Sequence, residues 1–291
     1  MRVATEAVPE TMRSLIGRIG AAKSLDPVVE KVSGWVTALT RSTPVKNALS
    51  GSWLGHQLHP VLTDLPIGAW SSAVAIDLTC GEAGAPVARR LVGLGLLASA
   101  PTALSGAADW SDTYGRDKRV GFVHAASNET VSGLQAVSWL LRRRGHRGAG
   151  AALSLLALGV TLGSAYLGGH LSLARGIGVN HTAFQPRVTD WTDVAADADI
   201  AEGEMIRVEA DGVPVLLARQ DGSLNAISAV CSHAGGPLEE GSLDADGCVT
   251  CPWLGSRFFL EDGSVQRGPA SVPQPRWKLR VEGGRVRVRS A

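Results

Sequence analysis

The stretch Cys231–Phe258 reads CSHAGGPLEEGSLDADGCVTCPWLGSRF and decides how the last third of this 291-residue chain is interpreted. It holds a Cys-x-His group at Cys231 and His233 and, seventeen residues later, a second cysteine loop that begins at Cys251, with Cys248 just before it. Three cysteines this close together, beside a histidine, make a poor disulfide framework and indicate a metal cluster. The fourth cysteine, Cys80, stands alone in an apolar segment.

Short β-rich runs surround these loops. From residue 190 to the end of the chain they alternate polar and apolar side chains and are separated by Asp-Gly or Gly-Gly pairs, at residues 211–212, 221–222, 246–247, 262–263 and 283–284. Such pairs favour the tight turns of β-hairpins. Their recurrence predicts a small antiparallel sandwich or barrel, so the cysteine loops belong to an all-β domain.

The two loops resemble those of the Rieske [2Fe–2S] family, and the resemblance covers residues 188–291. It rests on Cys231-Ser232-His233, on Cys251-Pro252-Trp253-Leu254-Gly255-Ser256 and on Gly268-Pro269-Ala270, which stands where the family has a proline loop over the cluster. The resemblance implies a [2Fe–2S] cluster with Cys231 and Cys251 on one iron and His233 on the other. Histidine ligands lower the cluster's negative charge and raise its reduction potential relative to an all-cysteine cluster.

Leu254 is the departure from this family, because it occupies the position of the second histidine ligand and has no donor atom. Three explanations stay open: an engineered or variant sequence, a degenerate domain without a stable cluster, and a modified cluster with an outside ligand. Water, an anion or Cys248 would be that ligand. Cys248 lies on an expected strand, however, and the alternative is a buried structural thiol.

Two residues near the second loop bear on the reduction potential that the resemblance implies. Ser256 matches a hydroxyl that donates to a cluster sulfur in high-potential relatives, whereas Phe258 stands where those relatives have a tyrosine. Losing a donor leaves more negative charge uncompensated and lowers the potential. The resemblance therefore points to the ferredoxin or oxygenase type rather than the quinol-oxidising type.

The middle of the chain is apolar. Four stretches approach the ~20 residues that a helix needs to cross a bilayer: Val61–Cys80, Leu91–Ala108, Val120–Leu141 and Ala149–Leu173. Arginines 142–144 end the third stretch as a membrane flank would. Asp64, Asp77 and Glu129 lie within the first and third stretches, so a buried soluble bundle is the alternative to a membrane bundle.

Residues 50–182 resemble an uncharacterised family of small four-helix bacterial membrane proteins, which implies no established activity. The resemblance rests on Pro66-Ile67-Gly68 with the histidine before it, on Gly106-Ala107-Ala108-Asp109-Trp110 and on Gly169-His170-Leu171. Within this half, His59, His124 and His170 are candidates to bind haem b or a quinone, because imidazole suits both. A structural hydrogen-bond network with the nearby acids is the alternative, since ionisable groups in a membrane bundle need partners.

These patterns predict a multi-domain chain, an N-terminal four-helix membrane bundle followed by a C-terminal all-β Rieske-type sandwich. The expected boundaries are residues 1–50 for an amphipathic helical segment, 51–175 for the bundle, 176–187 for a linker and 188–291 for the Rieske domain. The 28 basic and 27 acidic residues nearly balance, which argues against a nucleic-acid partner.

The leading functional hypothesis is a membrane-anchored electron-transfer protein that contacts lipid and links a redox donor to an acceptor. A cluster-less Rieske-fold scaffold and a quinone- or haem-linked oxidoreductase are the alternatives. No nucleophile–base pair is evident, so we expect an electron-transfer component rather than a stand-alone enzyme. We further expect a multi-pass protein of the cell membrane, with a homo-oligomer left open.

The orientation in the membrane rests on two opposing signals. No export signal is recognised at the N-terminus, which places the β-domain on the cytoplasmic side. The distribution of arginines over the loops slightly favours the opposite orientation.

Overall fold

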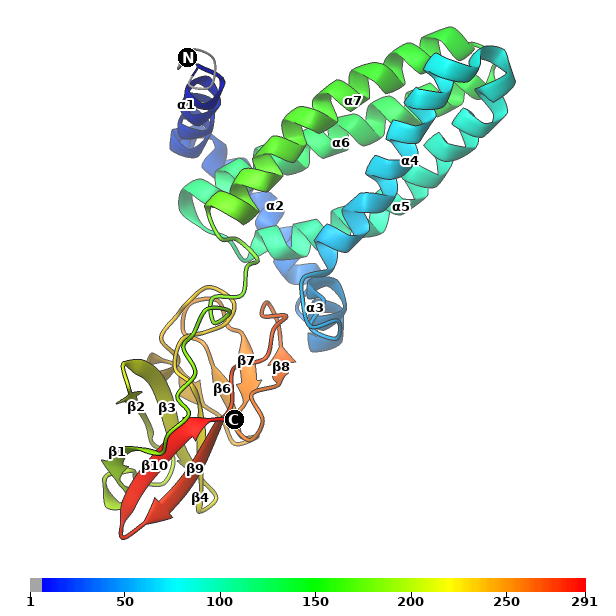
Figure 1. The fold of residues 1–291 in the computed structure, drawn as a ribbon. Helices are drawn as coiled ribbons and strands as arrows, with labels where there is room; N and C mark the ends of the chain where they lie inside the picture. The colour runs from blue at the N-terminus through cyan, green and yellow to red at the C-terminus, as the bar shows by residue number, and fades with distance from the viewer. Residues whose placement is uncertain (1–6) are drawn as a thin grey trace, which may run out of the picture. The chain divides into compact units, whose positions relative to one another are not determined.

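The computed structural model describes residues 7–291, so residues 1–6 of the expected N-terminal segment lie outside it. The chain forms two compact units. One contains the described residues up to Arg41 together with Leu58–Ile177, and the other contains Ser42–Gln57 together with Gly178–Ala291. Helices dominate the first unit and strands the second, which confirms the predicted multi-domain class (Figure 1).

The helical unit contains six α-helices in its described part. Two lie before residue 50, α1 (Ala7–Ala21) and α2 (Asp26–Leu39), and four are long: α4 (Leu58–Cys80), α5 (Ala85–Ser111), α6 (Gly115–Arg143) and α7 (Arg147–Gly169). The four long helices, α4–α7, coincide with the four apolar stretches. A π-helical turn, His170–Ala174, continues α7. By length and composition, Leu58–Ser111 and Arg147–Ala174 are apolar enough to cross a membrane.

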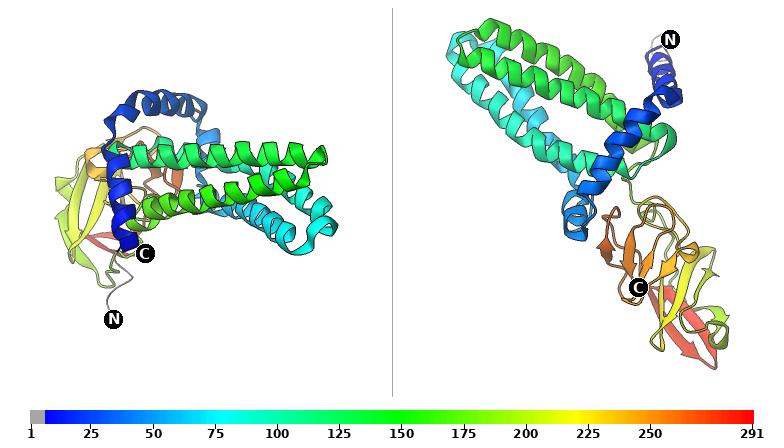
Figure 2. Two further views of the ribbon diagram at one scale, coloured as in Figure 1. Left: turned by 90° about the horizontal axis from the view of Figure 1, so that it is seen from above. Right: turned by 180° about the vertical axis from the view of Figure 1, so that it is seen from behind.

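Small residues set the spacing of the long helices, which run side by side in both views of Figure 2. A Cβ on Gly95 of α5 would overlap the indole of Trp70 on α4, and a Cβ on Gly121 would overlap Trp110. Close approach of helix backbones through small residues is typical of membrane helices. Both tryptophans are buried, so they pack between helices.

The interior of the helical unit is polar at one end. Arg142 on α6 donates to both carboxylate oxygens of Asp77 on α4, over 3.0 and 2.5 Å, and to the hydroxyls of Ser138 and Ser154. Both charged side chains are almost fully buried, with 2% and 5% exposed. Such a pair is stable only because each charge has its partner and further hydrogen bonds.

The second unit contains three antiparallel sheets. Their strand orders are β1-β10-β9, β2-β3-β4 and β5-β6-β7-β8. The strands are β1 (Thr192–Ala196), β2 (Met205–Ala210), β3 (Val213–Gln220), β4 (Ser223–Ser228), β5 (Ser242–Leu243), β6 (Cys248–Thr250), β7 (Arg257–Phe259), β8 (Val265–Arg267), β9 (Trp277–Glu282) and β10 (Arg285–Ser290).

The hairpin turns lie where the sequence predicted them. Asp211-Gly212 joins β2 to β3 and Asp221-Gly222 joins β3 to β4, with positive φ at all four residues. Positive φ at both central residues is what the tightest hairpins require. The strands enclose two apolar cores, and one of them includes Cys231, Cys251 and Phe258.

Helix α3 (Thr43–Ser50) belongs to the β-rich unit. Asn47 donates to the carbonyl of Gln266 and accepts from the backbone N–H of Gly268, both over 2.9 Å. Ser50 is fully buried against Gly268. The helix thus packs beside the Gly268-Pro269-Ala270 loop, whereas the expected boundaries at residues 50 and 188 placed it with the N-terminal helices.

Candidate metal centre

The two cysteine loops adopt the same backbone conformation. In the first, the N–H of Cys231 donates to the carbonyl of Gly236 and the N–H of Gly235 donates to the carbonyl of Cys231, over 2.8 and 2.9 Å. In the second, Cys251, Ser256 and Gly255 repeat this pattern over 2.8 and 3.1 Å. Gly235 and Gly255 both have positive φ, 77° and 73°, which favours glycine in each turn.

The two loops bring their thiols together. A hydrogen bond from the Cys231 thiol lowers the pKa of Cys251 to about 6, while that bond and then burial raise the pKa of Cys231. Each sulfur also accepts hydrogen bonds from backbone N–H groups two and three residues further along the chain. The donors are His233 and Ala234 for Cys231, and Trp253 and Leu254 for Cys251. Two neighbouring buried sulfurs that accept backbone hydrogen bonds are prepared to bind a cation as thiolates.

Gly236 allows the loops to meet. A Cβ at this position would lie 3.0 Å from the Cys251 sulfur and 3.0 Å from Cγ of Trp253. Both distances are below normal van der Waals contact, so any side chain at Gly236 would push the second loop away. The glycine therefore fixes the spacing between the two thiol-bearing loops.

The imidazole of His233 is in the neutral form that binds metals. Burial first, and then the positive charges of Lys46 and His181, lower its pKa to about 4. Lys46 comes from α3 and is 3% exposed. A positive charge beside the ligand loop favours the reduced state of any cluster held there, because reduction adds negative charge.

Gln274 fixes the first loop. Its Oε1 accepts from the N–H of Ser232 over 2.8 Å, and its Nε2 donates to the carbonyls of Ser228 and Val230 over 2.9 and 2.8 Å. The hydroxyl of Ser232 also donates to the carbonyl of Val272 over 2.7 Å. Gln274 is 2% exposed, so these bonds are protected from water and hold the segment between Cys231 and His233 in place.

Ser256 is buried at the end of the second loop. Its oxygen accepts from the N–H of Ala270 over 3.0 Å, which leaves its own hydrogen free to donate, and the residue is 1% exposed. Phe258, at the expected tyrosine position, is fully buried in the core and offers no donor. One of the two hydroxyls that raise the cluster potential in high-potential relatives is therefore available.

The residues present fit three of the four ligand positions of a Rieske cluster. Cys231 and Cys251 offer paired sulfurs and His233 offers a neutral imidazole. Leu254 is half-buried at the fourth position and has no donor atom.

Cys248 lies apart from this group. It pairs with Phe259 across β6 and β7, and the charged groups around its thiol are Asp244, Arg257 and Asp246, none of which belongs to the thiol-bearing turns. Burial raises its pKa to about 11. These surroundings suit a structural thiol and give no support to a ligand role.

The histidines of the helical unit bond to backbone. Nδ1 of His59 bonds the carbonyl of Thr102 over 3.0 Å, and Nδ1 of His124 bonds the carbonyl of Ser164 over 2.8 Å. His170 begins the π-helical turn after α7. These bonds link neighbouring helices. Asp77 pairs with Arg142 and not with a histidine. Neither these contacts nor the comparisons below support the expected haem or quinone.

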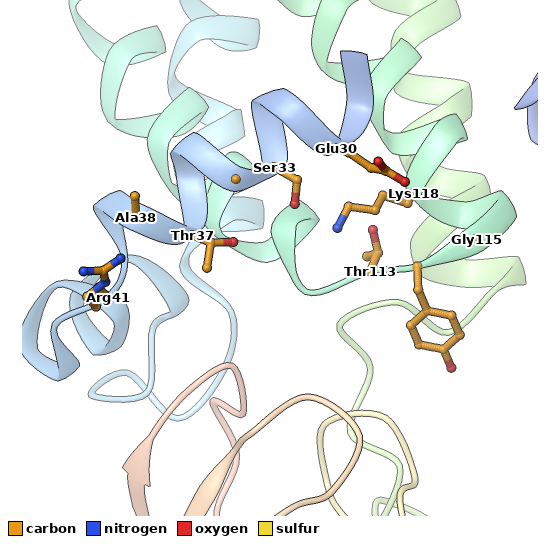
Figure 3. Close-up of a pocket in the computed structure, with 10 residues that line it drawn as sticks. Glu30, Ser33, Thr37, Ala38, Arg41, Thr113, Gly115 and Lys118 are labelled. Carbon is orange, nitrogen blue, oxygen red and sulfur yellow. The ribbon is translucent and has the colours of Figure 1, made fainter. Parts of the chain in front are cut away.

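An open cavity of about 490 Å³ lies in the helical unit between α2 and the turn that joins α5 to α6 (Figure 3). Glu30, Tyr114 and Lys118 are among the residues that line it. Burial lowers the pKa of Lys118. No sequence pattern predicted this cavity, and no cluster of metal-binding side chains lines it.

Three residues near the thiol-bearing loops were not predicted from the sequence: Lys46, His181 and Gln274. Each is distant in sequence from both loops or lies outside the family motif, and none belongs to a periodic pattern. Only the folded backbone brings them to the site.

Comparison with known proteins matches two families to different parts of the chain. The family described as "Rieske [2Fe-2S] domain" matches residues 190–278, and "Predicted membrane protein (DUF2231)" matches residues 55–181. Both lie where the sequence analysis expected them.

Similar curated proteins include ferredoxin components of dioxygenases. The ferredoxin component of biphenyl 2,3-dioxygenase from Rhodococcus jostii (strain RHA1) is 34% identical over 97 residues, which are 33% of this chain and 90% of that protein. The ferredoxin subunit of 3-phenylpropionate/cinnamic acid dioxygenase from Escherichia coli (strain K12) is 35% identical over 89 residues, 31% of this chain and 83% of that protein. Among solved structures, the ferredoxin of carbazole 1,9a-dioxygenase from Nocardioides aromaticivorans IC177 is 27% identical, with a TM-score of 0.34, and the match covers 35% of this chain and all of that one.

Proposed function

Since the chain belongs to the Rieske [2Fe-2S] family through its C-terminal unit, we propose that it passes single electrons through a [2Fe–2S] cluster held by Cys231, Cys251 and His233. The observation that carries this proposal is the pair of matching loops, which place two thiols together and aim backbone N–H groups at them. A bound cluster supplies one-electron chemistry, and the protein holds it and sets its potential.

The surrounding residues stabilise the charge that an electron adds. Backbone N–H groups at both sulfurs, the hydroxyl of Ser256 and the positive charge of Lys46 all favour the more negative, reduced state. The neutral His233 coordinates without adding a negative charge. Phe258 removes one donor, so we place the potential below that of relatives that have a tyrosine there.

We propose that the helical unit is a multi-pass membrane anchor in contact with lipid. Its outward side chains include many large apolar residues, whereas charged and hydroxyl side chains such as Arg142 and Ser154 are buried. This distribution suits an apolar surrounding, because lipid solvates leucine and not a charge. The orientation follows the expectation above, with the β-rich unit on the cytoplasmic side.

The partners are proposed from the similar proteins. Those proteins are named as ferredoxin components of dioxygenases, and the proposed acceptor here is likewise an oxygenase-type redox protein. The donor is a redox protein that reduces the cluster one electron at a time.

Because Leu254 has no donor atom, a second candidate function is a membrane scaffold whose Rieske fold holds no cluster. A redox titration of the purified full chain, followed by visible absorbance, separates the two. Electron transfer predicts a single one-electron step, whereas a chain without any titrating absorbance after anaerobic reconstitution supports the scaffold. Retention of the chain in carbonate-washed membranes tests the anchor, and its release into the wash would contradict it.

A further inference from the structure

The ligand that replaces the missing second histidine is the open question of this site. We propose that His181 supplies that imidazole, so that one iron of the cluster is held by His233 and His181. This inference rests on the proposed function, because it concerns the same cluster. Nothing in the motif assigns His181, which lies fifty residues before the first loop.

The backbone holds His181 against the first ligand loop. Its N–H donates over 3.0 Å to the carbonyl of Ser232, the residue between Cys231 and His233. On its other side, the N–H and hydroxyl of Thr182 both donate to Oδ1 of Asn180, over 2.9 and 2.8 Å. The segment is therefore fixed beside the loop.

The imidazole itself lies over the turn of that loop. Nδ1 of His181 is 3.4 Å from where a Cβ on Gly235 would lie, and it is the nearest atom to that position. In the matching turn of the second loop, nothing lies within 4 Å of the equivalent position at Gly255. The His181 side chain therefore covers the turn of the first loop, whereas no side chain covers the matching turn of the second loop.

Within the described residues, no hydrogen bond occupies the His181 ring, and the residue is exposed. Its ring nitrogens are therefore available to bind a metal.

Few other groups can take this role. The β-rich unit contains two further histidines, His233 and His56. Nδ1 of His56 bonds the neighbouring carbonyl of Gln57 over 2.9 Å in an exposed position. The thiol of Cys248 is surrounded by residues outside the ligand turns. His181 is thus the donor that the fold brings to the loop.

Counting the histidine nitrogens on the cluster tests the proposal. The full chain, labelled with ¹⁵N-histidine and reconstituted with iron and sulfide, is reduced with dithionite and measured by electron spin-echo envelope modulation. Wild type is expected to show two coupled histidines. His181→Ala is expected to show one and to lose at least about half of its iron, since one of four protein ligands is absent.

His56→Ala is the matched control and should leave both the spectrum and the iron content unchanged. Leu254→His in the His181→Ala chain should restore two coupled histidines, which shows that the variant still folds. A wild-type cluster with one coupled histidine, or a spectrum that His181→Ala leaves unchanged, would overturn the inference and leave electron transfer standing.

Failure of the proposed function has a different signature. If neither wild type nor Leu254→His binds iron, the unit does not hold a cluster and both proposals fall. If Leu254→His binds a cluster and wild type does not, His181 does not substitute for the missing ligand.

Discussion

Replacing Gln274 by alanine should destabilise the β-rich unit and its first ligand loop. The change removes three hydrogen bonds to backbone, to the N–H of Ser232 and to the carbonyls of Ser228 and Val230. A buried backbone group left without a partner costs about 1–3 kcal/mol, and water that enters the vacated space recovers part of this. We therefore expect Gln274→Ala to lower the free energy of unfolding by about 3 kcal/mol.

For a unit of this size, 1 kcal/mol corresponds to about 3–4 °C in melting temperature, so the expected shift is about 10 °C. Near-ultraviolet circular dichroism of the heated full chain measures it. Gln220→Ala is the matched control, because Gln220 also donates to two carbonyls, those of Asp244 and Ala245, over 3.0 and 3.2 Å, but at a partly exposed position. A Gln274→Ala chain that melts within about 3–4 °C of the Gln220→Ala chain would refute the role given to Gln274, since that interval is about 1 kcal/mol.

Three further predictions concern the sulfurs and the helical unit. Gly236→Ala should reduce iron bound per chain by about tenfold, because its Cβ would meet the Cys251 sulfur; normal iron content in a colorimetric assay would contradict this. Ser256→Ala should lower the reduction potential by tens of millivolts at unchanged iron content, measured by redox titration, and an unchanged potential would show that the hydroxyl does not reach a sulfur. Arg142→Met should cost about 3–5 kcal/mol of stability by leaving Asp77 buried and unpaired; denaturant titration should show recovery in the Asp77→Asn/Arg142→Met pair, and equal loss in both variants would argue against the ion pair.

The β-rich fold was predictable because its signals are local. Asp-Gly pairs favour tight turns whatever surrounds them. Each cysteine loop contains its glycine and its characteristic hydrogen bonds within six residues. The resemblance to the Rieske family implied that Cys231 and Cys251 act together, and the structure brings their thiols within hydrogen-bond distance. Ser256 and Phe258, next to the second loop, are buried.

The surroundings of the site were not predictable, because they depend on contacts between distant segments. Helix α3 carries Asn47 to the Gly268 backbone across some 220 residues of chain, and nothing in its own sequence indicates that partner. His181 and Gln274 act through a backbone carbonyl and a backbone N–H of Ser232, which any residue would offer. Sequence patterns record such contacts poorly.

The same difference between local signals and distant contacts explains which features of the helical unit were predictable. Its four apolar stretches were predicted within a few residues, because length and hydrophobicity are properties of each segment alone. Whether an acid finds a cation depends on packing, and Asp77 pairs with Arg142 from a helix more than sixty residues away. The histidines bond backbone carbonyls of other helices, which no spacing indicated.

We propose that this chain binds a [2Fe–2S] cluster although Leu254 occupies a ligand position. Iron and acid-labile sulfide per chain, measured after anaerobic reconstitution together with the electron paramagnetic resonance spectrum of the dithionite-reduced protein, test it most directly. We expect about two irons and two sulfides per chain and the spectrum of a reduced binuclear cluster with histidine ligands. Protein that stays free of iron and gives no signal would contradict it.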